Sequence, residues 1–218
     1  VIVGPSSSPD GSVEPLEDCD AVIRTEVIHS TWGSMGAATV SRSEIAYCSD
    51  SSANLHQSEI FEALTTNQVD VVVVRPSMAN MWDIQESVKK SVRVSPGEDC
   101  TPLVGSRFAI PRILHDVLRY RPASVHIRDA DLFTAAKPYR DGYQADGWSH
   151  YDAEALVRVL PMYGHDLGAD FRFLRDLYGH GLFSASEPMK KLFVMPVEQY
   201  LATIPNWIDD SVGRTGER

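Results

Sequence analysis

The sequence predicts an α/β fold, with a mostly parallel sheet and helices on both faces, from three observations. Short apolar segments alternate with segments of helical character along most of the 218 residues, as is typical of layered α/β folds. Residues 69–74 are a nearly pure β-branched run, as expected for a strand buried on both faces of a parallel sheet. Residues 1–3 lead into a turn rich in small residues, the outline of a nucleotide-binding first loop. The predicted fold is therefore Rossmann-like.

Three predicted elements lie between the first strand and the β-branched run. Residues 19–24 and 43–48 are expected to form strands, and residues 58–64 suit a short helix. This alternation favours parallel strands joined by crossover connections.

The second half of the chain repeats the pattern. A helix is expected from about residue 108 to residue 120, and a strand over residues 124–128 ends at residues 129–131. Pro111 falls in or near the first turn of that helix, where its missing N–H would have no intrahelical partner.

The stretch 163–170 contains His165, which follows a glycine and stands at the start of an amphipathic helix. The positive end of the helix dipole disfavours an imidazolium there, so the ring is expected to stay neutral near pH 7 and to act as a base. A surface or capping histidine is the alternative. The helix should bury an apolar stripe formed by Phe171, Leu174 and Leu177 or Tyr178.

The composition is ordinary for a soluble globular protein, with 43% hydrophobic and 23% charged residues. The formal charge of -10 argues against a nonspecific nucleic-acid binder, since such proteins present basic surfaces to phosphate. An anionic ligand would therefore need a local basic pocket. No apolar run reaches the roughly 18 residues of a membrane-spanning helix.

We expect one α/β domain over residues 1–210 and a polar tail over residues 211–218. Residues 137–148 are rich in Pro, Tyr, Gly and Asp without a clear period, which predicts a lid over about residues 134–162. The chain starts at Val1 inside a predicted strand, and removal of a native leader, anchor or upstream domain is one explanation.

The cysteines are Cys19, Cys48 and Cys100, and they form no CxxC or Cys/His pattern. Neither a disulfide framework nor a zinc site is suggested, and reduced structural cysteines are expected.

Four loops are expected at the carboxyl edge of the sheet, where open α/β sheets bind their ligands. They are residues 4–8, 24–26, 49–51 and 129–139. Gly4 would let the backbone approach a phosphate, and Ser6 begins a serine run that could supply hydroxyl and amide donors. A tight structural turn is the alternative. The chain has neither GxGxxG nor GxxxxGKS/T, so a dinucleotide fingerprint and a P-loop are both absent from the sequence.

A second candidate anion site combines Gly105, Ser106 and Arg107 at a predicted helix N-terminus. An N-cap serine followed by a solvated arginine is the alternative. Asp131, at a strand end, could bind a ribose hydroxyl or a base, or cap a turn. Tyr139 could donate its phenol to a departing phosphate.

In this order, the segments resemble the sialyltransferases, both the bacterial lipooligosaccharide type and the animal and plant type with sialyl motifs. The resemblance covers roughly residues 1–188. Its most specific parts are residues 105–133, which resemble the family's S-motif segment, and residues 164–188, where the acid Asp170 follows His165 by five positions. Within that part, residues 182–183 would complete the final strand and residues 184–188 the loop after it.

The first half resembles the family more loosely. Gly4, Pro5 and Ser6 resemble its glycine-rich first loop, and Arg24 resembles the arginine that ends a segment of the L-motif.

Three positions depart from the bacterial pattern. Glu26 and Ser49 stand where bacterial members carry asparagines, and Phe133 stands where they use a tyrosine against the phosphate. Tyr139 retains the second such tyrosine.

The resemblance implies the GT-A-like variant fold of sialyltransferases and transfer of a sialic-acid-like or other ulosonic sugar from a CMP-sugar to an acceptor hydroxyl. The catalytic residues would be His165 as general base and Tyr139, with no metal and no cofactor beyond the CMP-sugar co-substrate. The nucleotide-sugar-binding residues would be Gly4, Pro5, Ser6, Arg24, Glu26, Ser49, Gly105, Ser106, Arg107, Asp131 and Phe133.

Two other interpretations stay open: a nucleotide-sugar hydrolase or transferase of another donor on the same fold, and a non-catalytic nucleotide-binding domain. The expected partners are a CMP-sugar donor and a glycan or other hydroxyl acceptor, with no nucleic acid. A bacterial member would be cytoplasmic, either free or attached to the membrane, and a eukaryotic member would lie in the Golgi lumen behind a removed anchor.

Overall fold

The computed structural model describes residues 1–4, 19–25, 43–48, 57–66, 68–76, 89–95, 108–134 and 166–204. Within these ranges, seven strands form one sheet in the order β5-β4-β3-β2-β1-β6-β7. Every neighbouring pair is parallel. The strands are β1 (Ile2–Val3), β2 (Ala21–Thr25), β3 (Ser43–Tyr47), β4 (Val71–Val74), β5 (Val92–Val94), β6 (His126–Arg128) and β7 (Ser184–Ala185). The predicted Rossmann-like α/β fold is confirmed.

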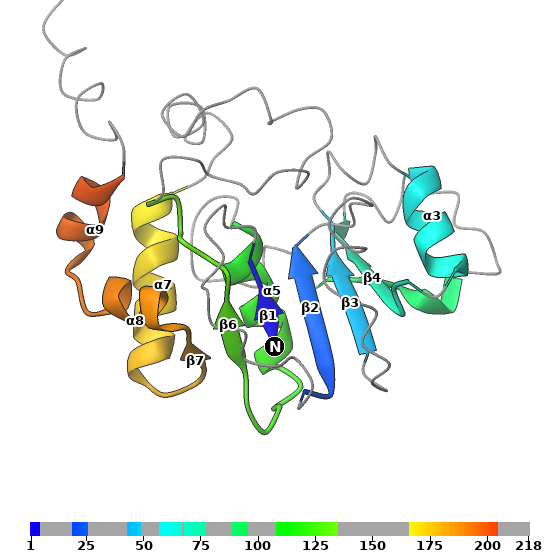
Figure 1. The fold of residues 1–218 in the computed structure, drawn as a ribbon, viewed down its shortest axis with the longest axis horizontal. Coiled ribbons are helices and arrows are strands. Elements are labelled where there is room, and N and C mark those ends of the chain that lie inside the picture. The colour runs from blue at the N-terminus through cyan, green and yellow to red at the C-terminus, as the bar shows by residue number, and fades with distance from the viewer. Residues whose placement is uncertain are drawn as a thin grey trace, which may run out of the picture.

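Helices flank this sheet. The described ones are α3 (Gln57–Thr65), α5 (Ala109–Leu118), α7 (Leu167–Gly179), α8 (Glu187–Phe193) and α9 (Val197–Thr203), with a short 3-10 turn, η3 (Lys89–Ser91). Figure 1 shows α5 behind β1, α7 beside β6 and α3 beyond β4 at the opposite end of the sheet. The chain thus covers the sheet through helices that are far apart in sequence.

One face of the sheet packs against α5 and α7. Ile2 lies in register with Ile23 on one side and Ile127 on the other. All three side chains belong to one buried apolar cluster with Ile113 of α5 and Phe171 of α7. Since alternate strand residues point to opposite faces, this register brings one isoleucine row of three strands against the helices.

The other face has its own core near β4. Ile60 and Leu64 of α3 are buried with Val72 and Val74 of the all-valine strand. Val73 belongs to the cluster on the α5 face. The β-branched run is therefore buried on both faces, as the sequence predicts, and helices lie on both sides of the sheet.

The predicted stripe of α7 is also confirmed. Phe171 and Leu174 are each 1% exposed, whereas Arg172 and Asp176 are exposed. Helix α7 begins at Leu167, two residues after His165.

The strand order contains one change of direction. From β1 the chain adds β2, β3, β4 and β5 on one side, then crosses back to add β6 and β7 on the other. The strand order reverses between β1 and β6. The carboxyl ends of these two strands therefore form the topological switch point, where sheets of this kind bind ligands.

The end of the sheet differs from the prediction. The final strand is Ser184–Ala185 rather than residues 182–183, and residues 184–188 are not a loop, because they hold β7 and the start of α8. The backbone N–H of Ser184 donates to the Val125 carbonyl at 2.9 Å, which is where pairing with β6 begins. Phe183 instead packs its ring against both Tyr178 and Phe193.

Strand β5 was not predicted, and a buried polar cluster explains its position. The Arg93 guanidinium donates to Asp116 Oδ1 at 3.2 Å and also contacts Oδ2, while the Tyr47 hydroxyl donates to Oδ2 at 2.6 Å. Asp116 belongs to α5 and is 2% exposed. Its carboxylate therefore ties α5 to β3 and to the edge strand β5. Burial, with the hydrogen bond to Asp116, raises the pKa of Tyr47.

Candidate functional site

Gly4 marks the point where β1 ends against β6. Its backbone N–H donates to the Arg128 carbonyl at 2.9 Å. A Cβ at this position would lie 2.6 Å from both the Ala130 Cβ and the Asp129 carbonyl oxygen, closer than real side chains pack. Only glycine fits without a shift of backbone, so the segments that follow β1 and β6 leave the sheet in direct contact.

The turn after β6 is held in an uncommon backbone conformation. Asp129, Leu132 and Phe133 have φ angles of 50°, 50° and 69°. Non-glycine residues seldom adopt this left-handed region, and each instance costs on the order of 1 kcal/mol or more. Such turns persist only where surrounding contacts impose them, and they concentrate at functional sites.

Asp131 organises the centre of this turn. Its Oδ1 accepts the Phe133 backbone N–H at 3.0 Å, and its carbonyl accepts both the backbone N–H and the hydroxyl of Thr134, at 3.1 and 2.7 Å. This is the turn-capping role that the sequence analysis kept open for Asp131. A ligand role for the same carboxylate is compatible with it, since a carboxylate accepts several hydrogen bonds.

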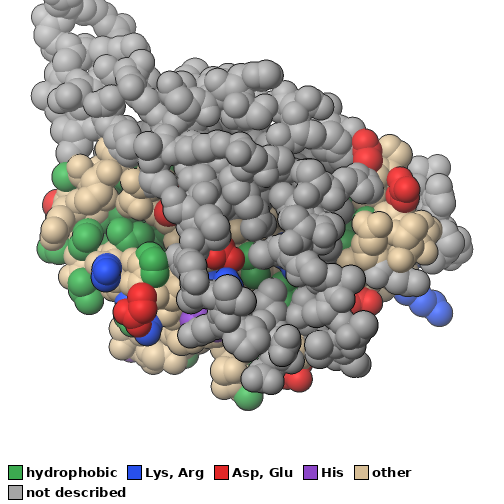
Figure 2. All heavy atoms as spheres, viewed as in Figure 1, with side chains coloured by type: hydrophobic (Ala, Val, Ile, Leu, Met, Phe, Trp, Pro, Cys, Tyr) green, Lys and Arg blue, Asp and Glu red, His purple; other side chains and the backbone are tan. Residues whose placement is uncertain are grey.

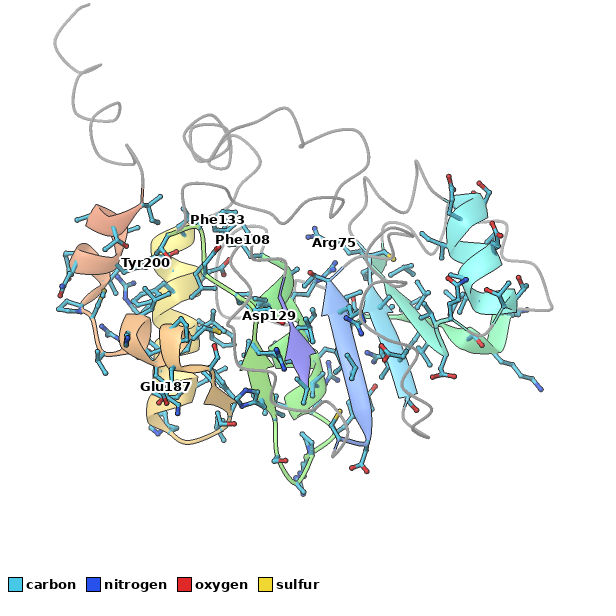
Figure 3. All side chains as sticks on the ribbon, in the orientation of Figure 1. Arg75, Phe108, Asp129, Phe133, Glu187 and Tyr200 are labelled. Atoms are coloured by element: carbon cyan, nitrogen blue, oxygen red, sulfur yellow. The ribbon has the colours of Figure 1, made fainter. Side chains whose placement is uncertain are left out.

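Phe133 connects the turn to the beginning of α5. Its ring lies against that of Phe108, with centroids 4.8 Å apart and planes tilted by 50°. Figure 3 shows the two labelled phenylalanines next to each other, toward the same end of the strands as Arg75. Phe133 thus makes an aromatic contact with the N-terminus of α5.

Asp170 joins α7 to the same place. Its Oδ2 accepts the backbone N–H of Phe108 at 2.9 Å, and its side chain is buried at 6% exposure. Phe108 is the N-cap residue of α5 and has no side-chain capping bond of its own. The acid five positions after His165 therefore caps the preceding helix from a distance of 62 residues in sequence.

The first turn of α7 carries two carboxylates. Asp166 is its N-cap and accepts the Ala169 backbone N–H at 2.8 Å, and Asp170 lies in the first turn. Both favour the helix through its dipole. Carboxylates also favour the charged form of a nearby imidazole, whereas the helix N-terminus favours the neutral form. His165 precedes Asp166 directly, and its predicted neutral state therefore depends on more than the dipole.

Tyr200 of α9 reaches the turn from the C-terminal side. Its hydroxyl donates to the Leu132 carbonyl at 2.8 Å, and its ring stacks on Phe171 with centroids 3.9 Å apart and planes at 7°. Burial raises the pKa of Tyr200, and the charges of Asp170 and Asp131 raise it further. The phenol is thus a permanent donor at neutral pH.

Arg24 lies apart from this cluster. β2 continues to Thr25, so Arg24 is a strand residue rather than the start of a loop, and it is 5% exposed. Its Nε pairs with Glu44 Oε2 at 3.2 Å. Strand register puts it beside Val3 and on the same face as Arg128, whose Nε pairs with the buried carboxylate of Asp129 at 3.1 Å. Figure 2, viewed from this face, shows acidic and basic side-chain atoms together near its centre.

Most of the other predicted site residues lie outside the described ranges. They are Pro5, Ser6, Glu26, Ser49, Gly105, Ser106, Arg107, Tyr139 and His165, together with the lid predicted over about residues 134–162 beyond Thr134. Several adjoin described residues, namely Gly4, Thr25, Cys48, Phe108 and Asp166. Of the predicted residues that are described, Gly4, Asp131 and Phe133 come together.

The sequence indicated no function for Phe108 or Tyr200, and it included Asp129 only as the first residue of the predicted loop 129–139. Asp129 and Phe108 stand at the predicted end of a strand and start of a helix, which is the signal that could have singled them out. Tyr200 carries no local signal, because its contact with Leu132 spans 68 residues.

Comparison with protein-family models, with curated proteins and with solved structures finds no match for this chain. Within the described part, no three or more His, Cys, Asp or Glu side chains are grouped so that they could hold a metal ion. The helices that the structure describes include none that is long and apolar enough to cross a membrane.

Proposed function

We propose that this chain is a glycosyltransferase that moves a sialic-acid-like or other ulosonic sugar from a CMP-sugar to an acceptor hydroxyl. Its general base is His165, and the reaction uses no metal. The donor nucleotide binds at the switch point between β1 and β6. The proposal combines the resemblance of the sequence motifs with the contacts between the described segments at that edge.

One observation carries the proposal: four segments that the motifs single out meet at one edge of the sheet. Gly4 of the first loop touches the turn after β6. Phe133 of that turn touches Phe108 at the start of α5. Asp170 of the His165 segment bonds to Phe108. The ring of Phe108 makes one of these contacts and its backbone N–H another, and together the contacts support a single site rather than scattered structural turns.

The chemistry follows from the charges that develop during transfer. CMP departs as a phosphate anion, which the hydroxyl of Ser106, the guanidinium of Arg107 and the phenol of Tyr139 stabilise. His165 accepts the proton of the acceptor hydroxyl as its oxygen attacks the anomeric carbon. The bond from that carbon to the phosphate oxygen breaks and releases CMP. The proton from the acceptor hydroxyl stays on the imidazole of His165.

A transferase for a different donor is the second candidate, and Phe133 is the observation that favours it. A phenylalanine packed on Phe108 donates no hydrogen bond to a phosphate, unlike the family's tyrosine. A donor site at this position would therefore be more apolar than in the family. This change alters the selection of the donor sugar without removing the base.

The test measures CMP release from CMP-sialic acid and from CMP-Kdo, with and without sugar acceptors. Acceptor-dependent release from one donor supports the transferase. Release at the same rate without any acceptor identifies a hydrolase. Binding of CMP without release from either donor would point to a nucleotide-binding domain or to another donor, and absence of CMP binding would overturn the proposal.

A further inference from the structure

We infer that Tyr200 is a positioning residue of the donor site: its hydroxyl holds the turn that carries Asp131 and Phe133. This inference rests on the proposed function for the identity of the ligand. The hydrogen bond itself and its effect on the turn can be tested separately.

The turn requires support from outside. Leu132 and Phe133 lie in succession with φ angles of 50° and 69°, a conformation that L residues adopt at a cost. The Asp131 bonds to Phe133 and Thr134 close the turn within itself. Tyr200 adds a bond to the Leu132 carbonyl from a helix 68 residues away, at 2.8 Å.

Tyr200 is rigid enough for this task. Its side chain is 1% exposed, and its ring is nearly parallel to that of Phe171. An aromatic ring packed in this way loses little further entropy when its hydroxyl forms a bond, so the hydroxyl stays in one position. Tyr200 therefore constrains the Leu132 carbonyl rather than following it.

Helix α9 is also fixed relative to the first turn of α7. Leu167 at the start of α7 and Val197 of α9 are buried in the same apolar cluster, and the rings of Phe171 and Tyr200 stack on each other. The helix that begins just after His165 and the turn that holds Asp131 are thus both attached to α9. Through Tyr200, the base segment and the donor segment share one support.

The test uses Tyr200→Phe, which keeps the stacked ring and removes the hydroxyl alone. Loss of one net hydrogen bond leaves a domain folded, since domains are stable by about 5–15 kcal/mol. The matched control is Tyr178→Phe, a tyrosine of the same aromatic cluster whose ring packs on Phe183 and Phe193. Its position near the far end of α7 removes it from the turn.

Two quantities are measured in both variants: hydrogen exchange at the Phe133 and Thr134 amides, and the dissociation constant for CMP. In Tyr200→Phe both amides should exchange about two- to tenfold faster, the factor that one net hydrogen bond supplies, and CMP should bind more weakly by a similar factor. Tyr178→Phe should change neither. Replacement of Tyr200 by 4-aminophenylalanine, which restores a donor, should recover most of both effects.

The possible results distinguish a failure of the role inferred for Tyr200 from a failure of the proposed function. Equal amide exchange in wild type and Tyr200→Phe overturns the inference, as does faster exchange with an unchanged CMP affinity. Faster exchange in a chain whose wild type binds no CMP overturns the proposed function instead, and leaves Tyr200 as a structural support of the turn.

Discussion

The carboxylate of Asp170 accepts the backbone N–H of Phe108 at 2.9 Å, so the first turn of α7 caps the start of α5. In the resemblance, Asp170 is the acid that accompanies the histidine. In this chain the acid fixes two helix ends against each other, and His165 directly precedes the N-cap residue of α7 in the sequence.

Asp170→Ala should destabilise the fold by about 1–2 kcal/mol, because it leaves the partly buried N–H of Phe108 without this acceptor. Urea unfolding followed by far-UV circular dichroism measures the change. Asp176→Ala, at an exposed position on the same helix, should alter stability by less than about 0.5 kcal/mol. Equal effects of the two substitutions would contradict the capping role.

His165→Ala should slow sugar transfer by about 100- to 10,000-fold, the usual contribution of a general base, while CMP binding persists. The control is His180→Ala, an exposed histidine that caps the other end of α7. Rates are measured as acceptor-dependent CMP release. A His165→Ala enzyme with wild-type rates would exclude the imidazole as base.

Gly4→Ala should destabilise the fold by about 1–3 kcal/mol, because its Cβ would overlap the Ala130 side chain and the Asp129 carbonyl at 2.6 Å. Gly179→Ala offers the matched control, since a Cβ there meets nothing within 4 Å. At that helical position alanine should be neutral or stabilising by up to about 1 kcal/mol. Unfolding midpoints compare the two, and equal midpoints for Gly4→Ala and wild type would contradict this close approach of the two strand ends.

Arg93→Ala should cost about 2–4 kcal/mol, since it leaves the buried Asp116 carboxylate without its ion-pair partner. This loss of stability is smaller than for a fully buried ion pair, because the Arg93 side chain is 33% exposed. Arg172→Ala, exposed on α7, should have little effect. A small loss in Arg93→Ala would show that β5 is held by its backbone pairing alone.

Stability should fall as pH rises past the ordinary tyrosine range. Burial raises the pKa of Tyr47 in the folded chain, so the folded state keeps a proton that the unfolded state loses. The contribution is complete below a pH of about 10, the ordinary tyrosine pKa, and is lost progressively above it. Urea midpoints at pH 9 and at pH 11 should therefore diverge less in Tyr47→Phe than in wild type, and parallel losses would contradict this assignment.

The sequence allowed prediction of the elements whose residues carry a local signal. The valine run of β4 and the stripe of α7 are examples, because burial on two faces or on one helical side imposes a visible period. The β5 strand carries an arginine at its centre, which becomes acceptable only when Asp116 reaches it from α5. Its position therefore depends on tertiary structure.

The same distinction applies to the candidate site. Gly4 and Asp131 could be predicted, since strand ends and small or acidic residues have a known place in parallel sheets. The bonds from Asp170 to Phe108 and from Tyr200 to Leu132 join residues 62 and 68 positions apart. No spacing within either segment encodes such a contact, and α9 has only seven residues in which to show a period.

Strand β1 affects the tendency of the molecule to self-associate. It contributes only two residues, yet it pairs with β2 on one side and β6 on the other. Loss of residues 1–4 would expose two open strand borders at once, each with a row of unpaired amides and carbonyls next to apolar core. A chain without these residues should self-associate. Residues 1–4 therefore protect the protein from aggregation as well as joining β2 to β6.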